Sequence, residues 1–352
     1  MKTFDPKEGE RLMKISFLVT YYQQAKLVSE SMDSILALEK PDEWEILIGD
    51  DGSSDGTVNV AQSYVDRDPK HVRLFVMDRD PKITYNAVER ASLNRLNLVR
   101  HASGDCYCLM DGDDFYSETD FIPQAIMLLE TYPEVSVVAF DTWMYREGQS
   151  RKAGKPGSTE PVFESRKRYL RWQYTHAGAC VFRNSHTEAN LRMLENLSFF
   201  DDNDITLNAL NAGKLIRIHR PVYAYRQAEN SVYTTMCAAE RAALNLAGLG
   251  ACLRIMDPIW EKDVVARFAT AVWMAWFLRK DLENSRRSSR FRGYQEACHR
   301  IGFRQGELLL RYAELERREQ KEVRKWVRYA GRESPLRVAF AWTQVRGWRR
   351  KA

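Results

Sequence analysis

The chain has 352 residues, 44% hydrophobic and 29% charged, so it can bury a large core and is too apolar to be disordered as a whole. Its net charge of +5 is uneven, because residues 311–352 hold 13 Lys and Arg against 5 Glu, a net of +8 on a slightly acidic body. A basic surface confined to the tail, without a nucleic-acid-binding motif, argues against nucleic acid and predicts another anionic partner.

Residues 1–13 are interpreted as a polar leader, because they lack the apolar core of a signal peptide. Residues 264–278, the most apolar later stretch, contain Arg267 and are fewer than the ~20 needed to cross a bilayer. A buried helix is therefore expected there, with a membrane span as the alternative, and the protein is expected to be cytoplasmic. The six cysteines show no zinc spacing and fit reduced, mostly buried thiols.

Apolar runs alternate with amphipathic segments along the first 110 residues. The runs at 15–19, 45–48, 72–77 and 106–110 are predicted strands. Predicted helices follow the first three strands: one at 24–38, one capped by Ser53 or Ser54, and one at about 85–102. Strands that alternate with helices predict a parallel α/β sheet.

The second half of the chain continues the alternation less regularly. Another strand is predicted after Pro133, followed by a polar loop at 147–160 that could be mobile near a site. An acidic helix start lies within 199–211, and from about Ser231 onward the composition is helical to the end.

Unusual polar residues occupy the carboxyl ends of three predicted strands. They are Thr20 to Gln23, Asp50 with Asp51, and Asp111 to Asp114. Ligands of open parallel sheets bind beyond these strand ends, so the three loops are expected to meet at one crevice.

The segment DGDD places Asp111 and Asp113 around Gly112, which lets the backbone approach a ligand closely. Carboxylate oxygens with open coordination positions suit Mg²⁺ or Mn²⁺ bound to a diphosphate. The alternative is a solvated acidic turn. An EF-hand is a poor match, because Phe115 and Tyr116 fill positions that need an oxygen ligand and a glycine.

The segment DDGSSDGT also has two interpretations. A turn followed by a capped helix explains Gly52, Ser53 and Ser54. It does not explain two adjacent acids directly after a strand, where a carboxylate could accept a hydrogen bond from a uracil or guanine N–H. The glycine fingerprint of dinucleotide-binding folds is absent.

Three segments in this order, ISFLVTYYQ, WEILIGDDGSSDGT and ASGDCYCLMDGDD, resemble the family 2 glycosyltransferases with the GT-A fold. The resemblance covers residues 14–233 and implies an α/β fold whose mostly parallel sheet is flanked by helices. It implies an inverting sugar transfer from a nucleotide-diphosphate donor, a UDP-sugar being favoured, with Mn²⁺ or Mg²⁺ as cofactor. Residues 234–352 lie outside it and are predicted to form a helical subdomain with a basic amphipathic tail.

The resemblance implies a set of contacts to the nucleotide sugar. They are Thr20, Tyr22, Asp50, Asp51, Arg95, Asp111, Gly112 and Arg226. Asp113 matches the metal motif together with Asp111 and is the expected direct ligand. Gln23 stands in place of the family's usual asparagine, and Leu96 departs from the pattern around Arg95.

The segment FFDDNDITLNALN resembles the part of the family that faces the acceptor. Asp202 matches the general base, Asp201 takes the place of a more usual glutamate, and Asp204 is a competing candidate. Ordinary acids at a helix N-terminus are the alternative. Arg226 is expected either to contact the diphosphate or to pair with Glu229.

Two histidines, His176 and His219, are candidate ligands, although a packed or surface side chain is the favoured interpretation of each. The segment THAGACVFR, residues 175–183, is a candidate lining of the acceptor pocket.

The tail repeats apolar residues at helical spacing among arginines, as in Trp342, Val345 and Trp348. This pattern predicts either contact with the inner face of the cell membrane or docking on the acidic body. The expected acceptor is a glycan or lipid-linked hydroxyl in surface polysaccharide or glycolipid synthesis. The alternatives are a catalytically silent scaffold and a sugar-phosphate nucleotidyltransferase, which would need a glycine-rich phosphate loop after the first strand.

Overall fold

The computed structural model describes residues 13–146, 149–152, 159–172, 175–197 and 200–227, with 244, 248, 250–261, 263 and 264. The chain divides into two compact units, Met1–Tyr169 with Gln173–Ala228 and Leu170–Trp172 with Glu229–Ala352. Residues 1–12 of the polar leader, the basic tail and nearly all of the apolar stretch at 264–278 lie outside the described residues. No helix among the described residues is long and apolar enough to cross a bilayer.

Strands and helices alternate in the first half of the first unit, as predicted. The strands are β1 (Ile15–Tyr21), β2 (Trp44–Asp50), β3 (Val72–Val76) and β4 (Cys106–Asp111). The helices between them are α1 (Val28–Leu36), α2 (Thr57–Arg67) and α3 (Ala87–His101).

Short antiparallel strands enter the second half of the unit. Its strands are β5 (Phe115–Tyr116), β6 (Val135–Arg146), β7 (Gln149–Lys152), β8 (Val162–Glu164), β9 (Cys180–Arg183) and β10 (Lys214–Arg226). Its helices are α4 (Phe121–Thr131), α5 (Arg166–Trp172), the 3₁₀ turn η1 (Ala177–Ala179), α6 (Glu188–Leu197) and α7 (Asp202–Ala212). The second unit contributes the 3₁₀ turn η2 (Pro258–Trp260).

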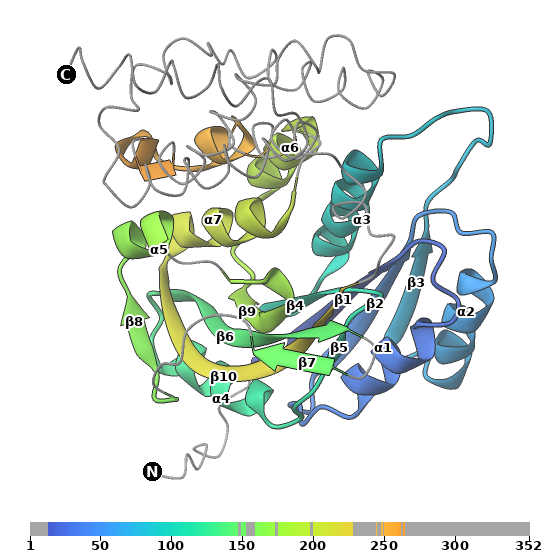
Figure 1. The fold of residues 1–352 in the computed structure, drawn as a ribbon, viewed down its shortest axis with the longest axis horizontal. Helices are drawn as coiled ribbons and strands as arrows, with labels where there is room; N and C mark the ends of the chain where they lie inside the picture. Colours follow the sequence, from blue (N-terminus) through green and yellow to red (C-terminus); the bar gives the residue numbers. More distant parts are fainter. Residues whose placement is uncertain are drawn as a thin grey trace, which may run out of the picture. The chain divides into compact units, whose positions relative to one another are not determined.

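These strands form one sheet in the order β3-β2-β1-β4-β9-β6-β10-β5, with β7 beside β6 and β8 beside β10 (Figure 1). Strands β3, β2, β1 and β4 run parallel, as do β6 and β10. Strands β5, β7, β8 and β9 pair antiparallel with their neighbours. The predicted α/β class is confirmed, and the sheet is mixed because these short strands close its second half.

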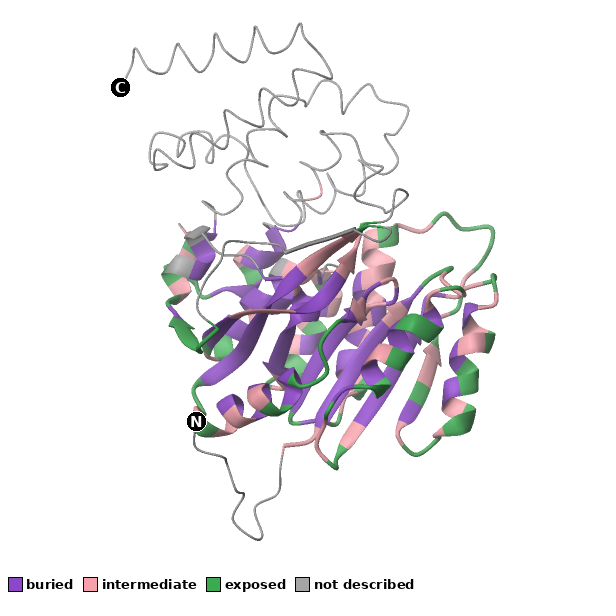
Figure 2. Cartoon of the chain, turned by 60° about the horizontal axis from the view of Figure 1, so that its bottom comes forward, coloured by how far each residue is buried: buried purple, intermediate pink, exposed green. Residues whose placement is uncertain are grey.

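Both faces of the sheet are covered by helices, and strand residues alternate between the two layers of core. Helices α1, α2 and α4 pack on one face, and α3, α6 and α7 lie on the other (Figure 1). The central strands are therefore buried along most of their length, while exposed residues lie on helix surfaces, on loops and on the strands β3 and β8 (Figure 2).

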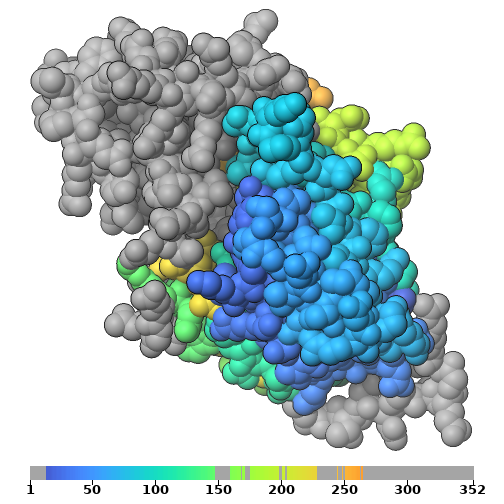
Figure 3. Space-filling model, turned by 90° about the vertical axis from the view of Figure 1, so that its right-hand side faces the viewer, coloured from blue at the N-terminus to red at the C-terminus, as the bar shows by residue number. Residues whose placement is uncertain are grey.

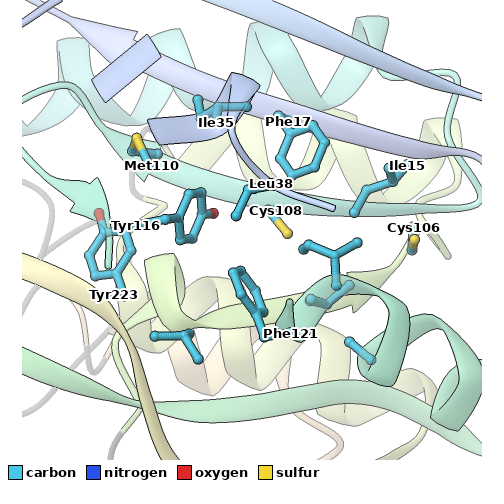
Figure 4. Close-up of a cluster of buried hydrophobic side chains, with 14 of the residues drawn as sticks. Ile15, Phe17, Ile35, Leu38, Cys106, Cys108, Met110, Tyr116, Phe121 and Tyr223 are labelled. Carbon is cyan, nitrogen blue, oxygen red and sulfur yellow. The ribbon is translucent and has the colours of Figure 1, made fainter. Parts of the chain in front are cut away.

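The core on the α1 and α4 side contains two of the predicted buried thiols. Cys106 and Cys108 share one face of β4 and pack among Ile15, Phe17 and Phe121 (Figure 4). Burial raises the pKa of Cys106 to about 12, so this thiol remains protonated and unreactive.

The predicted cap of the second helix is wrong. Helix α2 begins at Thr57 behind Gly56, whose φ of 99° favours glycine, and neither Ser53 nor Ser54 caps it. Ser53 is instead held by Asp50 in a tight turn, so the helix starts three residues later.

Figure 3 views the molecule from the side of β3 and α2, which is built mainly from the first third of the chain.

The polar loop predicted at 147–160 contains a strand. Residues 149–152 form β7 and pair with β6 from Trp143 to Arg146. The rest of that loop is described only at residues 159 and 160.

Candidate functional site

The register of the parallel strands brings the predicted loops together. Thr20 lies opposite Gly49 on β2 and opposite Asp111 on β4, and Tyr21 lies opposite Asp50. The carboxyl ends of β1, β2 and β4 therefore form one edge, as the sequence predicted.

Asp111 ends β4 and is held by an arginine from α3. Arg95 Nη2 lies 2.6 Å from Asp111 Oδ1, and the Thr20 hydroxyl donates to the same oxygen at 3.4 Å. Burial raises the pKa of Asp111, but the neighbouring Arg95 guanidinium and the Thr20 hydroxyl lower it, so the pKa ends below its usual range. The predicted nucleotide contact Arg95 thus lies directly against the metal motif.

Gly112 is required by close packing at this edge. A Cβ at this position would lie 2.0 Å from Cδ1 of the buried Tyr21 ring. Its N–H donates to the Thr20 carbonyl at 2.8 Å, which ties the loop to β1. Gly112 therefore lets the loop after β4 lie directly against β1.

Asp113 and Asp114 follow in the same loop and have different surroundings. Burial and then Asp111 raise the pKa of Asp113 to about 6. Asp114 is buried and accepts hydrogen bonds from the Tyr223 hydroxyl and the Arg226 N–H, both at 2.7 Å. Asp114 therefore fastens the loop to β10, whereas the pKa of Asp113 is raised by burial and by the neighbouring Asp111.

Arg226 lies beside this loop at the end of β10. Its Nε donates to the Asp113 carbonyl at 2.7 Å, and its Nη2 pairs with Glu30 of α1 at 2.5 Å. The structure thus supplies an ion-pair partner that the sequence did not suggest, while Glu229 lies outside the described residues.

Asp50 is fully buried at the end of β2. Its two oxygens accept from the Ser53 N–H and the Ser53 hydroxyl, each at 2.7 Å. Burial raises its pKa, and the hydrogen bonds from Ser53 only partly offset this. The predicted base contact therefore shapes the turn that follows the strand.

Asp51 is enclosed by two arginines that sequence reasoning missed. Arg79 Nη2 lies 2.7 Å from Asp51 Oδ2, and Arg90 pairs with Oδ1. The Arg79 guanidinium also lies 4.1 Å from the ring of Tyr22, which is 43% exposed, and 5.0 Å from Tyr85. Arg79 comes from the β3–α3 connection and Arg90 from the predicted helix α3, and no motif in the sequence links either arginine to Asp51.

The three acids around the start of α7 divide into two roles. The Asp201 N–H donates to Asp204 Oδ2 at 3.3 Å, and the Asp204 N–H donates to Asp201 Oδ1 at 3.4 Å. This reciprocal pair is a capping box, and Asp204 is completely buried. Asp202 instead accepts from the Ala177 N–H at 3.1 Å and is 28% exposed, so it is the acid that faces the edge of the site.

The two candidate histidines occupy different places. His176 stacks on Tyr223 of β10 with ring centroids 5.1 Å apart, and it packs at a tilt against Tyr225, 4.8 Å away. Its Nε2 lies 3.8 Å from Asp202 Oδ2. His219 lies 3.3 Å from Asp141 of β6, at an earlier position of β10. Only His176 joins the predicted site residues.

Arg95 lies within electrostatic reach of acids from two other elements. Burial lowers the pKa of Arg95, but Asp111 and then Asp202 and Asp201 raise it to a value above its ordinary one. Residues from β4, α3 and the start of α7 therefore share one electrostatic environment.

The donor set fits a divalent cation that also binds phosphate. Among the described residues, no group of three or more His, Cys, Asp or Glu side chains could enclose a metal. Two carboxylates, Asp111 and Asp113, repel each other at the mouth of the loop, and a cation shared with diphosphate oxygens would relieve that repulsion. Mg²⁺ and Mn²⁺ commonly bind in this way, with one or two carboxylates.

The carboxyl edge of this α/β sheet thus gathers the carboxylates of Asp111 and Asp113, Arg95 beside them, and Asp202 at a helix start. The family described as Glycosyl transferase family 2 matches residues 16–188. Residues 16–188 therefore form a domain of glycosyltransferase family 2.

Curated relatives are similar over part of their length. The putative glycosyltransferase EpsE of Bacillus subtilis (strain 168) is 28% identical over 134 residues, which cover 38% of this chain and 45% of EpsE. The poly-beta-1,6-N-acetyl-D-glucosamine synthase of Staphylococcus epidermidis is 31% identical over 122 residues, covering 32% of this chain and 27% of the synthase. The chain thus spans less than half the length of these relatives.

Solved structures share the fold. TarS 1–349 of S. aureus in complex with UDP-GlcNAc superposes with a TM-score of 0.55 at 16% identity, over 82% of this chain and 80% of that chain. The mannosyltransferase PcManGT of Pyrobaculum calidifontis, in complex with GDP-Man and Mn²⁺, superposes with a TM-score of 0.50 at 17% identity, over 90% of this chain and 84% of that chain.

Proposed function

We propose that this protein is a metal-dependent, inverting glycosyltransferase that moves a sugar from a nucleotide-diphosphate donor to an acceptor hydroxyl. The observation that carries the proposal is the convergence of Asp111, Asp113, Arg95 and Asp202 at one edge of the sheet. A cation site and a candidate base at one edge are what a single displacement at an anomeric carbon requires.

The diphosphate end of the donor would lie over the DGDD loop. Asp113 and Asp111 would hold Mn²⁺ or Mg²⁺, which supplies charge neutralisation for the departing diphosphate. Arg226, fixed at 2.7 Å from the Asp113 carbonyl, places a second cation beside the same loop. Arg95 would assist Asp111 and Asp113, because it lowers the pKa of Asp111 and keeps that carboxylate ionised.

Asp202 would act as the general base. Its Oδ1 is held by the Ala177 N–H, so the carboxylate keeps a fixed orientation at the start of α7. The acceptor hydroxyl loses its proton to Asp202 as its oxygen bonds to the anomeric carbon, and the bond to the diphosphate breaks with its electron pair. One displacement from the opposite side inverts the anomeric configuration.

The nucleoside would lie along the ends of β1 and β2. Thr20 and the exposed ring of Tyr22 face this edge, and Asp50 and Asp51 fix the loop beside them. We favour a UDP-sugar, as bound in TarS, with a GDP-sugar, as bound in PcManGT, as the rival donor.

The acceptor would be a glycan or lipid-linked hydroxyl in surface polysaccharide or glycolipid synthesis. The named activity of the Staphylococcus epidermidis synthase supports a polysaccharide product. Contact of the basic tail with the inner membrane face remains a prediction from its sequence alone.

A thermal-shift screen tests the proposal with UDP, GDP, CDP and TDP, each with Mn²⁺ and with EDTA. A ligand that binds the native state raises its melting temperature. We expect UDP with Mn²⁺ to give the largest shift and EDTA to remove it. No shift with any nucleotide would contradict the proposal and favour a silent scaffold.

A further inference from the structure

His176 is fixed on three sides beside Asp202. Its Nδ1 accepts a hydrogen bond from the Gly178 N–H at 3.2 Å. Its ring lies nearly parallel to Tyr223, at an interplanar angle of 28°, and Tyr225 covers it further. The side chain is only 10% exposed, so the imidazole cannot turn without losing these contacts.

These contacts determine which ring nitrogen carries the proton. Because Nδ1 accepts from the backbone, the neutral imidazole carries its proton on Nε2. Nε2 lies 3.8 Å from Asp202 Oδ2, too far for a direct hydrogen bond. An oxygen atom placed between them can lie about 2.8 Å from each.

Asp202 presents its second oxygen to the same gap. The Ala177 N–H occupies Oδ1 at 3.1 Å, so Oδ2 is the oxygen that faces His176. The turn that supplies this N–H packs tightly on β10, since a Cβ on Gly178 would lie 2.2 Å from Tyr223 Cζ. The donor and the acceptor on either side of the gap are therefore held by one rigid unit.

We propose that His176 Nε2–H and Asp202 Oδ2 together hold the acceptor hydroxyl, so that His176 orients the oxygen that Asp202 deprotonates. This inference rests on the proposed function. The hydroxyl oxygen accepts from Nε2–H and donates its proton to Oδ2, which leaves a lone pair for the anomeric carbon. During transfer the proton moves to Asp202, the new C–O bond forms and the bond to the diphosphate breaks, while His176 neither gains nor loses a proton.

A matched pair of variants separates this role from packing. His176→Gln restores an amide N–H near the position of Nε2, and His176→Asn restores only a group near Nδ1. The readout is nucleotide release from UDP-GlcNAc and from GDP-mannose in Mn²⁺, with water as the hydroxyl. We expect the glutamine variant to keep kcat within about threefold and the asparagine variant to lose about 10²-fold, with unchanged nucleotide Kd in both.

The possible results distinguish this inference from the proposed function. Equal kcat values for the two variants, or a parallel loss of nucleotide affinity, would overturn the role of His176 alone. A wild-type protein that binds no nucleotide, or releases none from either donor, would overturn the proposed function and this inference with it. His71→Asn is the control. His71 directly precedes β3 and stacks on Trp44 at the amino edge of the sheet, opposite the edge that carries the site.

Discussion

The two aspartate pairs at the carboxyl edge of the sheet differ in what neutralises them. Asp50 and Asp51 follow β2 and are satisfied within the chain, by Ser53 and by Arg79 with Arg90. In the DGDD loop Arg95 neutralises Asp111, whereas burial and Asp111 together raise the pKa of Asp113 to about 6.

This difference indicates that similar motifs do different work. The first pair is built into the loop, where it holds the turn at Ser53 and the side chains of Arg79 and Arg90 in place. The second pair holds excess negative charge that a cation would relieve. Mutations in the first pair should therefore act mainly on stability, and mutations around the second should act mainly on binding and turnover.

The largest expected effect is on turnover, at the candidate base Asp202. Asp202→Asn should lower kcat about 10³-fold, because general-base catalysis contributes about 10²–10⁴-fold, while nucleotide affinity stays unchanged. Steady-state nucleotide release and a UDP titration in Mn²⁺ measure the two quantities.

The matched control for that variant is Asp204→Asn. Asp204 belongs to the capping box of α7, so its change should lower the melting temperature with a smaller effect on kcat. A larger loss of kcat at Asp204 than at Asp202 would move the base to Asp204.

The next largest effect concerns Asp50 and Asp51, whose carboxylates are paired within the chain. Asp51→Ala leaves Arg79 and Arg90 without their shared carboxylate, and breaking a mostly buried ion pair costs about 3–5 kcal/mol of unfolding free energy. Chemical denaturation measures this loss. A stable variant that no longer binds nucleotide would show that Asp51 contacts the base directly.

Removal of the cation ligand should give a smaller change in free energy. Asp113→Ala should raise the Kd for UDP in Mn²⁺ about 10²-fold and leave metal-free stability intact or improved, because a buried repulsive charge is lost. Isothermal titration with Mn²⁺ and with EDTA checks both parts. Unchanged affinity in Mn²⁺ would rule out the metal assignment.

The smallest effect is a pH dependence with opposite signs for binding and stability. Asp113 takes up a proton as the pH falls through about 6, so Mn²⁺-dependent UDP affinity should fall about tenfold per unit below that pH. The native pKa lies above the unfolded value, so the same proton uptake stabilises the ligand-free fold. That contribution is present below about pH 4 and is lost as the pH rises through 6. Melting curves and UDP titrations between pH 5 and 8 should therefore move in opposite directions, and Asp113→Asn should flatten both.

Much of the fold was predictable because its signals are local. The first four strands lie within two residues of their predicted bounds, since buried parallel strands appear as short apolar runs. The short strands β5, β7 and β8 were missed, because two to four residues show no periodicity. The cap at Ser53 was mispredicted because Asp50 competes for the same serine.

The sequence by itself determined which acids stand at the carboxyl ends of strands, because strand and turn patterns are written in neighbouring residues. Only the tertiary structure decided the partner of each acid. Arg90 reaches Asp51 across 39 residues, and Arg226 reaches Glu30 across 196. Charges attract over space rather than along the chain, so it is the folding of β10, α3 and η1 onto one edge that separates a structural aspartate from one poised for chemistry.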